Sequence, residues 1–293
     1  SYLSWFVTLI VCWSTLFVSI VLFLDLREIS FISYAMGGWE PPWGIEYRVD
    51  KLNSYLLLII SGISALVVSY GKASIDKEVD ENRHYLFWAS YLLCQAGLLG
   101  VTITGDAFNI FVFLEISSLA SYVLIAMGKD RRALVASYRY LIMGTIGATF
   151  IVLGIGLIYS LTGTLNLYDM ANRLSEIENS KSKFAAFSFL LVGISLKSAL
   201  FPLHAWLPNS YSFSPSVASA LLAAVSTKVG IYLLIRFSFD TFGNQEIFEK
   251  EQISYIIVFL SLLAILYGSF AAINEFNLKK LFAFSSISQI GFI

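Results

Sequence analysis

The sequence predicts an all-α protein, a polytopic bundle of transmembrane helices, and three observations support this fold class. Hydrophobic residues make up 57% of the 293-residue chain, and charged residues make up only 13%, about half the charged fraction of a typical soluble domain. The apolar residues gather in continuous runs of about 20, which is the length that an α-helix needs to cross a bilayer. These runs lack the strict alternation that marks a transmembrane β-barrel.

Eight runs have the length of a membrane span, and a ninth begins near the end of the chain. In chain order they are Tyr2–Leu24, Leu52–Tyr70, Tyr85–Thr104, Ala107–Met127, Tyr140–Leu161, Phe184–Leu200, Val217–Ile235 and Ile253–Ile273, with the last beginning at Leu281. Small residues in the fifth run allow close helix approach; they are Gly144, Gly147, Ala148, Gly154 and Gly156.

A short segment after the fifth run has a different pattern. Apolar residues recur at helical spacing from Leu167 to Ile177, and charged residues lie between and after them, ending at Glu178. This pattern predicts either a helix lying at the membrane surface or a loop helix packed on the other spans.

Three ionisable residues lie inside the predicted spans: Glu115, Lys197 and Lys228. Each costs roughly 2.5–3.5 kcal/mol at the centre of a bilayer, so such residues usually face a protein interior or a water-filled cavity and serve a function. Glu115 lies about 12 Å from Ala107 and about 18 Å from Met127 along a helix, too deep for its side chain to reach water. A structural hydrogen bond or a snorkelling lysine is the alternative interpretation.

The stretch from Ser198 to Ser214 predicts a broken helix. Pro202 cannot donate a hydrogen bond to the carbonyl of Ser198, and Pro208 interrupts the path again. Broken helices inside membranes line cavities or are buried in protein, and transporters use them at ion sites. His204 lies within the break, where its ordinary pKa near 6.5 suits a proton relay. A polar loop residue is an equally good interpretation of His204.

These residues suggest how a proton could move. Burial disfavours the charged form of a lysine, and a neighbouring carboxylate restores it. If Glu115 approaches Lys197, the lysine holds its proton; if the two separate, the proton is released toward Lys228 or His204. Asp106, at the edge of a span, is predicted to cap a helix.

Several classes of function lack support in the sequence. The net charge of −1 gives no basic field for nucleic acid. The sequence has no P-loop or dinucleotide fingerprint. Cys12 and Cys94 each sit in an apolar run and are predicted to be small buried side chains rather than a disulfide or metal cluster. We therefore expect no cofactor and no metal site.

Four segments of the sequence resemble a known family. Thr104-Gly-Asp-Ala-Phe-Asn-Ile-Phe-Val-Phe-Leu-Glu115 is similar to the signature of the D subunit of Mrp-type multisubunit cation/proton antiporters. Lys197-Ser-Ala-Leu-Phe-Pro-Leu-His-Ala-Trp-Leu-Pro208 resembles the wider family shared with antiporter-like subunits of respiratory complex I and membrane-bound hydrogenases. Thr227–Tyr232 and Lys279–Gly291 are similar to it too.

The resemblance implies a bundle of 14 helices with two inverted five-helix repeats. It divides the chain into N-terminal helices and a loop at 1–83, a complete first repeat at 84–239 with its broken helix at 184–214, and the start of the second repeat at 240–293. Glu115 matches the family's glutamate on helix five, Lys197 its lysine on broken helix seven, and Lys228 its lysine on helix eight. A further ionisable site on helix twelve would lie beyond Ile293, so we expect the chain to be a fragment.

The resemblance also implies the function, the partners and the location. The leading interpretation is a subunit of a cation/proton antiporter, with sodium as the expected cation. It would be a multi-pass protein of a prokaryotic cell membrane and would work with other membrane subunits. The first alternative is a proton-pumping subunit of a complex I or membrane-bound hydrogenase type redox complex. The second is a structural bundle with inactive charges. Asn209 and Leu114 depart from residues common in the family, and neither lies on the expected ion path.

Overall fold

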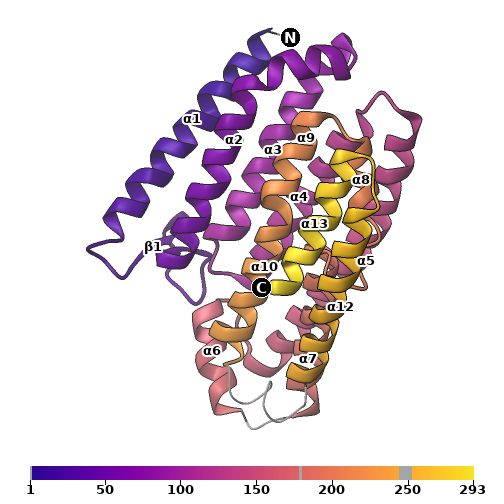
Figure 1. The fold of residues 1–293 in the computed structure, drawn as a ribbon. Helices are drawn as coiled ribbons and strands as arrows, with labels where there is room; N and C mark the ends of the chain where they lie inside the picture. Colours follow the sequence, from indigo (N-terminus) through magenta and orange to yellow (C-terminus); the bar gives the residue numbers. More distant parts are fainter. Residues whose placement is uncertain (1, 178–179, 244–252) are drawn as a thin grey trace.

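The computed structural model describes residues 2–177, 180–243 and 253–293, and Figure 1 shows them as one elongated bundle of helices. The helices run in chain order α1 (Tyr2–Asp25), α2 (Lys51–Glu78), α3 (His84–Ile103), α4 (Ala107–Ala126), α5 (Arg131–Thr162), α6 (Leu167–Glu176), α7 (Lys181–Ser198), α8 (Leu207–Phe213), α9 (Ser216–Leu221), α10 (Thr227–Ile235), α12 (Ile253–Ile273) and α13 (Leu278–Phe292). Shorter helical turns are η1 (Met36–Gly38), η2 (Glu81–Arg83), and the π-helical η3 (Leu222–Ser226) and η4 (Arg236–Thr241). The predicted helical membrane bundle is therefore confirmed.

Seven helical segments in the described part of the chain are long and apolar enough to cross a membrane. They match the predicted spans except for 184–200 and the run beginning at Leu281. The first of these corresponds to α7, which has only 18 residues and carries three lysines; the second corresponds to α13. The segment Ser216–Thr241 is one continuous helical rod made of α9, η3, α10 and η4.

A small β-hairpin joins α1 to α2 and was not predicted. Strand β1 (Phe31–Ala35) pairs antiparallel with β2 (Glu46–Asp50), so that Phe31 lies opposite Asp50. Each strand has only five residues, too few for a periodic pattern to be distinguished from a loop. Asp50 ends β2 and also caps α2, because its carboxylate accepts hydrogen bonds from the backbone of Leu52 and Asn53.

Helix α6 forms as predicted, at the end of the bundle where α7 begins (Figure 1). Its apolar residues Met170 and Leu174 are buried within the protein itself, which supports packing on the other helices over a helix lying on lipid. Asn166 caps its first turn. Glu178 of the predicted segment lies outside the described residues.

Close contact between α5 and α7 depends on glycine. A Cβ at Gly193 would lie 2.7 Å from the carbonyl oxygen of Gly147, and one at Gly154 would lie 2.7 Å from the Leu190 side chain. The expectation for Gly156 is wrong, since a Cβ there would meet nothing within 4 Å. This contact fixes α7, and with it Lys197, against the rest of the bundle.

Candidate ion-conducting site

Glu115 of α4 and Lys197 of α7 form an ion pair inside the bundle. The Lys197 Nζ lies 3.1 Å from Glu115 Oε1 and donates a second hydrogen bond to Ser118 Oγ at 2.8 Å. Lys197 is almost fully buried, whereas Glu115 is partly exposed. Because Glu115 and Ser118 are three residues apart on α4, they share one face of that helix. The ammonium is therefore held by a carboxylate and a hydroxyl from one neighbouring helix.

Lys197 is the next-to-last residue of α7, so the way this helix ends determines its position. Ala199 adopts the left-handed conformation with φ 59°, and its N–H and that of Leu200 donate to Leu196 and Ser195. The helix thus ends at Ser198, four residues before Pro202, and the chain is non-helical between α7 and α8 within the segment where the sequence predicts a broken helix. Trp206 Nε1 also donates to the Leu196 carbonyl at 3.0 Å, which holds the following loop against the helix end.

Lys228 lies in the rod Ser216–Thr241, directly after its first π-helical stretch. Its Nζ donates to the carbonyl oxygen of Ala223 at 2.7 Å, and it makes no ion pair with the acidic residues of the described ranges. The rod packs closely on the end of α7, since a Cβ at Gly230 would lie 3.0 Å from Ser198. Lys228 and Lys197 therefore lie on adjoining helix segments, and no direct hydrogen bond joins them.

His204 is buried in the loop between α7 and α8, but it stands apart from the Lys197 pair. Its ring centroid lies 5.2 Å from that of Phe201 and 4.9 Å from that of Tyr267 on α12. Its Nδ1 is buried without a hydrogen-bond partner among the described residues. The structure thus places His204 in an aromatic contact between the loop and α12.

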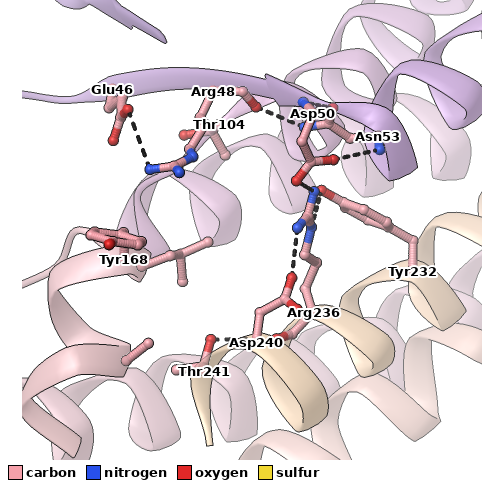
Figure 2. Close-up of a pocket in the computed structure, with 13 residues that line it drawn as sticks. Glu46, Arg48, Asp50, Asn53, Thr104, Tyr168, Tyr232, Arg236, Asp240 and Thr241 are labelled. Carbon is pink, nitrogen blue, oxygen red and sulfur yellow. Dashed lines mark hydrogen bonds and ion pairs between the residues drawn. The ribbon is translucent and has the colours of Figure 1, made fainter. Parts of the chain in front are cut away.

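A polar cavity of about 300 Å³ lies between the hairpin, α6 and the end of the rod (Figure 2). Five charged residues line it: Glu46, Arg48, Asp50, Arg236 and Asp240. The sequence analysis did not identify this site, because its residues lie at the edges of predicted spans, where charges are expected.

Arg236 is the centre of the hydrogen bonds around this cavity. Its Nη2 pairs with Asp50, its Nη1 donates to Asp240 at 2.6 Å, and its Nε donates to the Tyr232 hydroxyl at 2.9 Å. Tyr232 in turn donates to the Thr102 carbonyl at 3.0 Å. All three nitrogens of the guanidinium are thus engaged, and the group ties the rod to α2 and α3.

Glu46 and Arg48 extend the charged lining along β2. Glu46 is buried, and its two carboxylate oxygens accept hydrogen bonds from Ser33 at 2.6 Å and Asn166 at 2.9 Å. The guanidinium of Arg48 lies over the rings of Phe31 and Tyr168, 4.2 Å and 4.8 Å from their centroids. These contacts fasten the hairpin to the start of α6.

The structure also places Asp106 and the two cysteines. Asp106 caps α4 by accepting a hydrogen bond from the Asn109 backbone. Cys12 and Cys94 are both buried and free of disulfides. Within residues 2–177, 180–243 and 253–293, no group of three or more metal-ligating side chains is found.

Comparison with known proteins assigns most of the chain to a family. The family described as "NADH:quinone oxidoreductase/Mrp antiporter, TM" matches residues 104–293. The N subunit of the NADH-quinone oxidoreductase of Desulforudis audaxviator is 42% identical over 264 residues, which cover 89% of this chain and 51% of the relative. The D subunit of the Na(+)/H(+) antiporter of Alkalihalophilus pseudofirmus is 31% identical over 278 residues, which cover 95% of this chain and 55% of the relative. The chain therefore spans about half the length of these relatives.

Solved structures share the fold. A chain of the membrane-bound sulfane sulfur reductase, an archaeal respiratory membrane complex, superposes with a TM-score of 0.90 at 28% identity, covering 97% of this chain and 57% of that chain. A chain of the Mrp complex from Dietzia sp. DQ12-45-1b superposes with a TM-score of 0.87 at 24% identity, covering 99% of this chain and 53% of that chain. At such identity the second likeness shows the fold alone.

Proposed function

Because the chain belongs to the NADH:quinone oxidoreductase/Mrp antiporter family and is an antiporter-like, multi-pass membrane subunit, we propose that it conducts protons through Glu115, Lys197 and Lys228. The observation that carries the proposal is the buried contact of Lys197 with Glu115 and Ser118. An ionisable pair inside a membrane bundle is costly to place there, so a function is its expected role.

The geometry supports a gating role for the pair. At 3.1 Å two unit charges attract by on the order of 5 kcal/mol at an effective dielectric constant of about 20, so the pair favours a protonated Lys197. Separation of the two side chains removes that attraction, and the buried lysine then releases its proton more readily. Lys228 is a suitable acceptor, because among the described residues one backbone carbonyl holds it and no carboxylate pairs with it.

The proposal extends to the organisation of the chain. Residues 84–239 contain Glu115, Lys197, Lys228 and His204, and we assign them to one proton-conducting repeat. Residues 1–83 would form the preceding helices and 240–293 the start of a second repeat. His204 faces Tyr267 of that second segment, which makes it a candidate for passing a proton between the two repeats.

Two complexes are candidates for the whole protein. The sequence motifs favour a cation/proton antiporter, with sodium as the cation, in which this subunit works beside other membrane subunits in a prokaryotic cell membrane. A specific observation favours a redox-driven complex instead: the NADH-quinone oxidoreductase relative is 42% identical, against 31% for the Na(+)/H(+) antiporter relative. Purifying the tagged full-length protein with its partners distinguishes them, because small antiporter subunits and quinone or hydrogenase subunits are different proteins.

Proton flux into vesicles tests the conducting role. The full-length protein in its native complex would carry Lys197→Ala or Glu115→Ala, and flux would be followed with a pH-sensitive dye. We expect both substitutions to abolish most of the flux. Lys181→Ala is the matched control, because Lys181 lies on the same helix and is exposed. Wild-type flux in correctly assembled Lys197→Ala complexes would reject the proposal in favour of a structural bundle.

A further inference from the structure

The start of the rod is capped by a carboxylate from another helix. A helix leaves its first backbone N–H groups without partners inside the helix, and the residue before the rod, Pro215, makes no side-chain cap. Glu78, the last residue of α2, takes this role. One of its carboxylate oxygens accepts a hydrogen bond from the Ser216 N–H, and the other accepts one from the Ser216 hydroxyl at 2.6 Å. Its negative charge also stabilises the start of the rod through the helix dipole.

Helix α2 packs closely on the first turn of the rod. A Cβ at Gly71 of α2 would lie 3.2 Å from the Val217 side chain, so glycine allows this approach. On the other side, Lys279 of α13 donates to the carbonyl of Ser214 at 2.9 Å. Neither of these contacts reaches the first N–H group of the rod, which depends on Glu78.

The π-helical turn η3 lies between this anchored start and Lys228. Its hydrogen bonds span five residues instead of four, and such turns are rare and frequently found at functional sites. Two carbonyl oxygens of η3 accept hydrogen bonds from side chains. The carbonyl of Leu222 accepts from the Tyr211 hydroxyl at 3.0 Å, and the carbonyl of Ala223 accepts from the Lys228 ammonium at 2.7 Å. The π turn therefore provides the group that holds Lys228.

Beyond Lys228 the rod is fixed by a different helix. Tyr232 lies one turn further along the regular helix α10, and its hydroxyl donates to the Thr102 carbonyl of α3 at 3.0 Å. If η3 relaxed to α-helical geometry while Tyr232 stayed in place, the start of the rod would turn by about 100°, the rotation of one residue. Ser216 would then lose its contact with Glu78. The bond to Glu78 therefore opposes this relaxation.

We propose that Glu78 is a positioning residue for Lys228. By holding the start of the rod on α2, it keeps the π turn in place, and with it the Ala223 carbonyl that holds the ammonium. The inference rests on the proposed function, in which Lys228 accepts the proton, and it gives Glu78 no proton to transfer. Loss of the Glu78 contact would thus displace a carrier rather than remove one.

Glu78→Ala and Glu78→Gln, in the full-length protein within its complex, separate positioning from proton transfer. Alanine removes both contacts, and we expect proton flux to fall about tenfold, since a misplacement of about 1 Å can cost about 100-fold. Glutamine should recover most of the flux, because its amide oxygen accepts from the Ser216 N–H and its NH₂ group donates to the Ser216 hydroxyl. Equal losses in the two variants would overturn the positioning role, because the ionised carboxylate itself would then be needed.

Glu81→Ala is the matched control for loss of a negative charge. Glu81 is exposed and lies on η2, directly after α2. We expect this variant to conduct protons as the wild type does, since its side chain does not cap the rod. A loss equal to that of Glu78→Ala would show that the net charge of this corner matters rather than the cap, and would overturn the inference.

Thiol labelling at position 228 reports the position of the rod without a measurement of flux. Lys228→Cys would be combined with Cys12→Ala and Cys94→Ala, and its reaction with a water-soluble maleimide would be followed in the assembled complex by peptide mass spectrometry. We expect Glu78→Ala to change the labelling rate severalfold and Glu78→Gln to leave it nearly unchanged. Lys181→Cys, at an exposed position of α7, is the control reporter and should react equally in every background.

Ser216→Ala is the second variant if Glu78→Ala prevents assembly. It removes the hydroxyl contact and keeps the backbone contact, so we expect a smaller change in labelling in the same direction. Unchanged labelling of Lys228→Cys in Glu78→Ala, or in Ser216→Ala where only that variant assembles, would overturn the inference. Wild-type flux in Glu78→Ala under conditions where Lys197→Ala abolishes flux would also overturn it. If Lys197→Ala itself retains full flux, the proposed conducting role fails, and the labelling still decides whether Glu78 positions residue 228.

Discussion

Arg236 and Lys197 are two buried or half-buried cations with different kinds of surroundings. Arg236, at the wall of the polar cavity, donates through all three of its nitrogens to Asp50, Asp240 and Tyr232. Lys197 has two partners among the residues with described positions, the charged Glu115 and the neutral Ser118. In the part of the chain that the structure describes, Lys228 has one partner, the carbonyl of Ala223.

The difference distinguishes a structural tie from the proposed proton carriers. A guanidinium does not lose its proton in a protein, whereas a buried ammonium does so readily. Full hydrogen bonding fixes Arg236 in one place, while sparse bonding leaves the lysine side chains able to exchange partners. The bonding at the cavity therefore favours rigidity, and under the proposed function the less constrained pair in the interior suits proton transfer.

Exchanging the two kinds of cation sharpens this comparison most. Lys228→Arg keeps the positive charge but removes a group that can release its proton, so we expect proton flux to fall by about 100-fold, within the range of proton-transfer groups. The reciprocal change, Arg236→Lys, keeps an ammonium among the same carboxylates and should spare most of the flux. Vesicle flux measured at equal amounts of assembled complex checks both, and full activity of Lys228→Arg would contradict the carrier role.

Removing the structural tie should affect stability rather than conduction. Arg236→Ala leaves Asp50 without its ionic partner, and we expect a loss of about 2 kcal/mol of unfolding free energy, below the cost for fully buried pairs because Asp240 is half-exposed. Unfolding in detergent measures the loss. Asp80→Ala is a control at an exposed ion pair; an equal effect in the control would refute the special role of Arg236.

The helix contact that positions Lys197 gives a third comparison. Gly193→Ala would force a methyl group against the α5 backbone, so we expect a loss of about 1–3 kcal/mol of unfolding free energy from overpacking and a displaced α7. Gly156→Ala lies on α5 with open space around it and should be neutral or stabilise by up to about 1 kcal/mol. Thermal unfolding of the two variants checks this contrast. Equal changes in stability for the two variants would contradict it.

The smallest effect is expected at the exposed cap of α5. Hydrogen bonds from Arg132 lower the pKa of Asp130 below its ordinary value of 3.8. A lowered carboxyl pKa contributes stability above the unfolded pKa and loses it as the pH falls through the folded pKa. Asp130→Asn should therefore reduce stability slightly at neutral pH and leave it unchanged in strong acid, as unfolding across a pH series would measure. A difference that grows in acid would contradict this sign.

The candidate site could be predicted in part because deep charges are conspicuous in apolar runs. Glu115, Lys197 and Lys228 were identified on that ground, and the structure brings the first two into contact. Ser118 was not identified, because serine residues are common in transmembrane helices and carry no signal by spacing. The charged cavity was missed because its residues come from the hairpin, α2 and η4, which the sequence gives no reason to bring together.

The sequence by itself determined the helical spans and the depth of the buried charges. In a bilayer each backbone N–H and C=O must find a partner within the protein, so a long apolar run has little choice but to form a helix. Only the tertiary structure decided that Lys197 meets Glu115 and Ser118, about 80 residues away in the chain. It also ended α7 at Ser198, with Ala199 as its cap, and formed the hairpin, because these features depend on side chains and backbone groups that only the packed helices bring into contact.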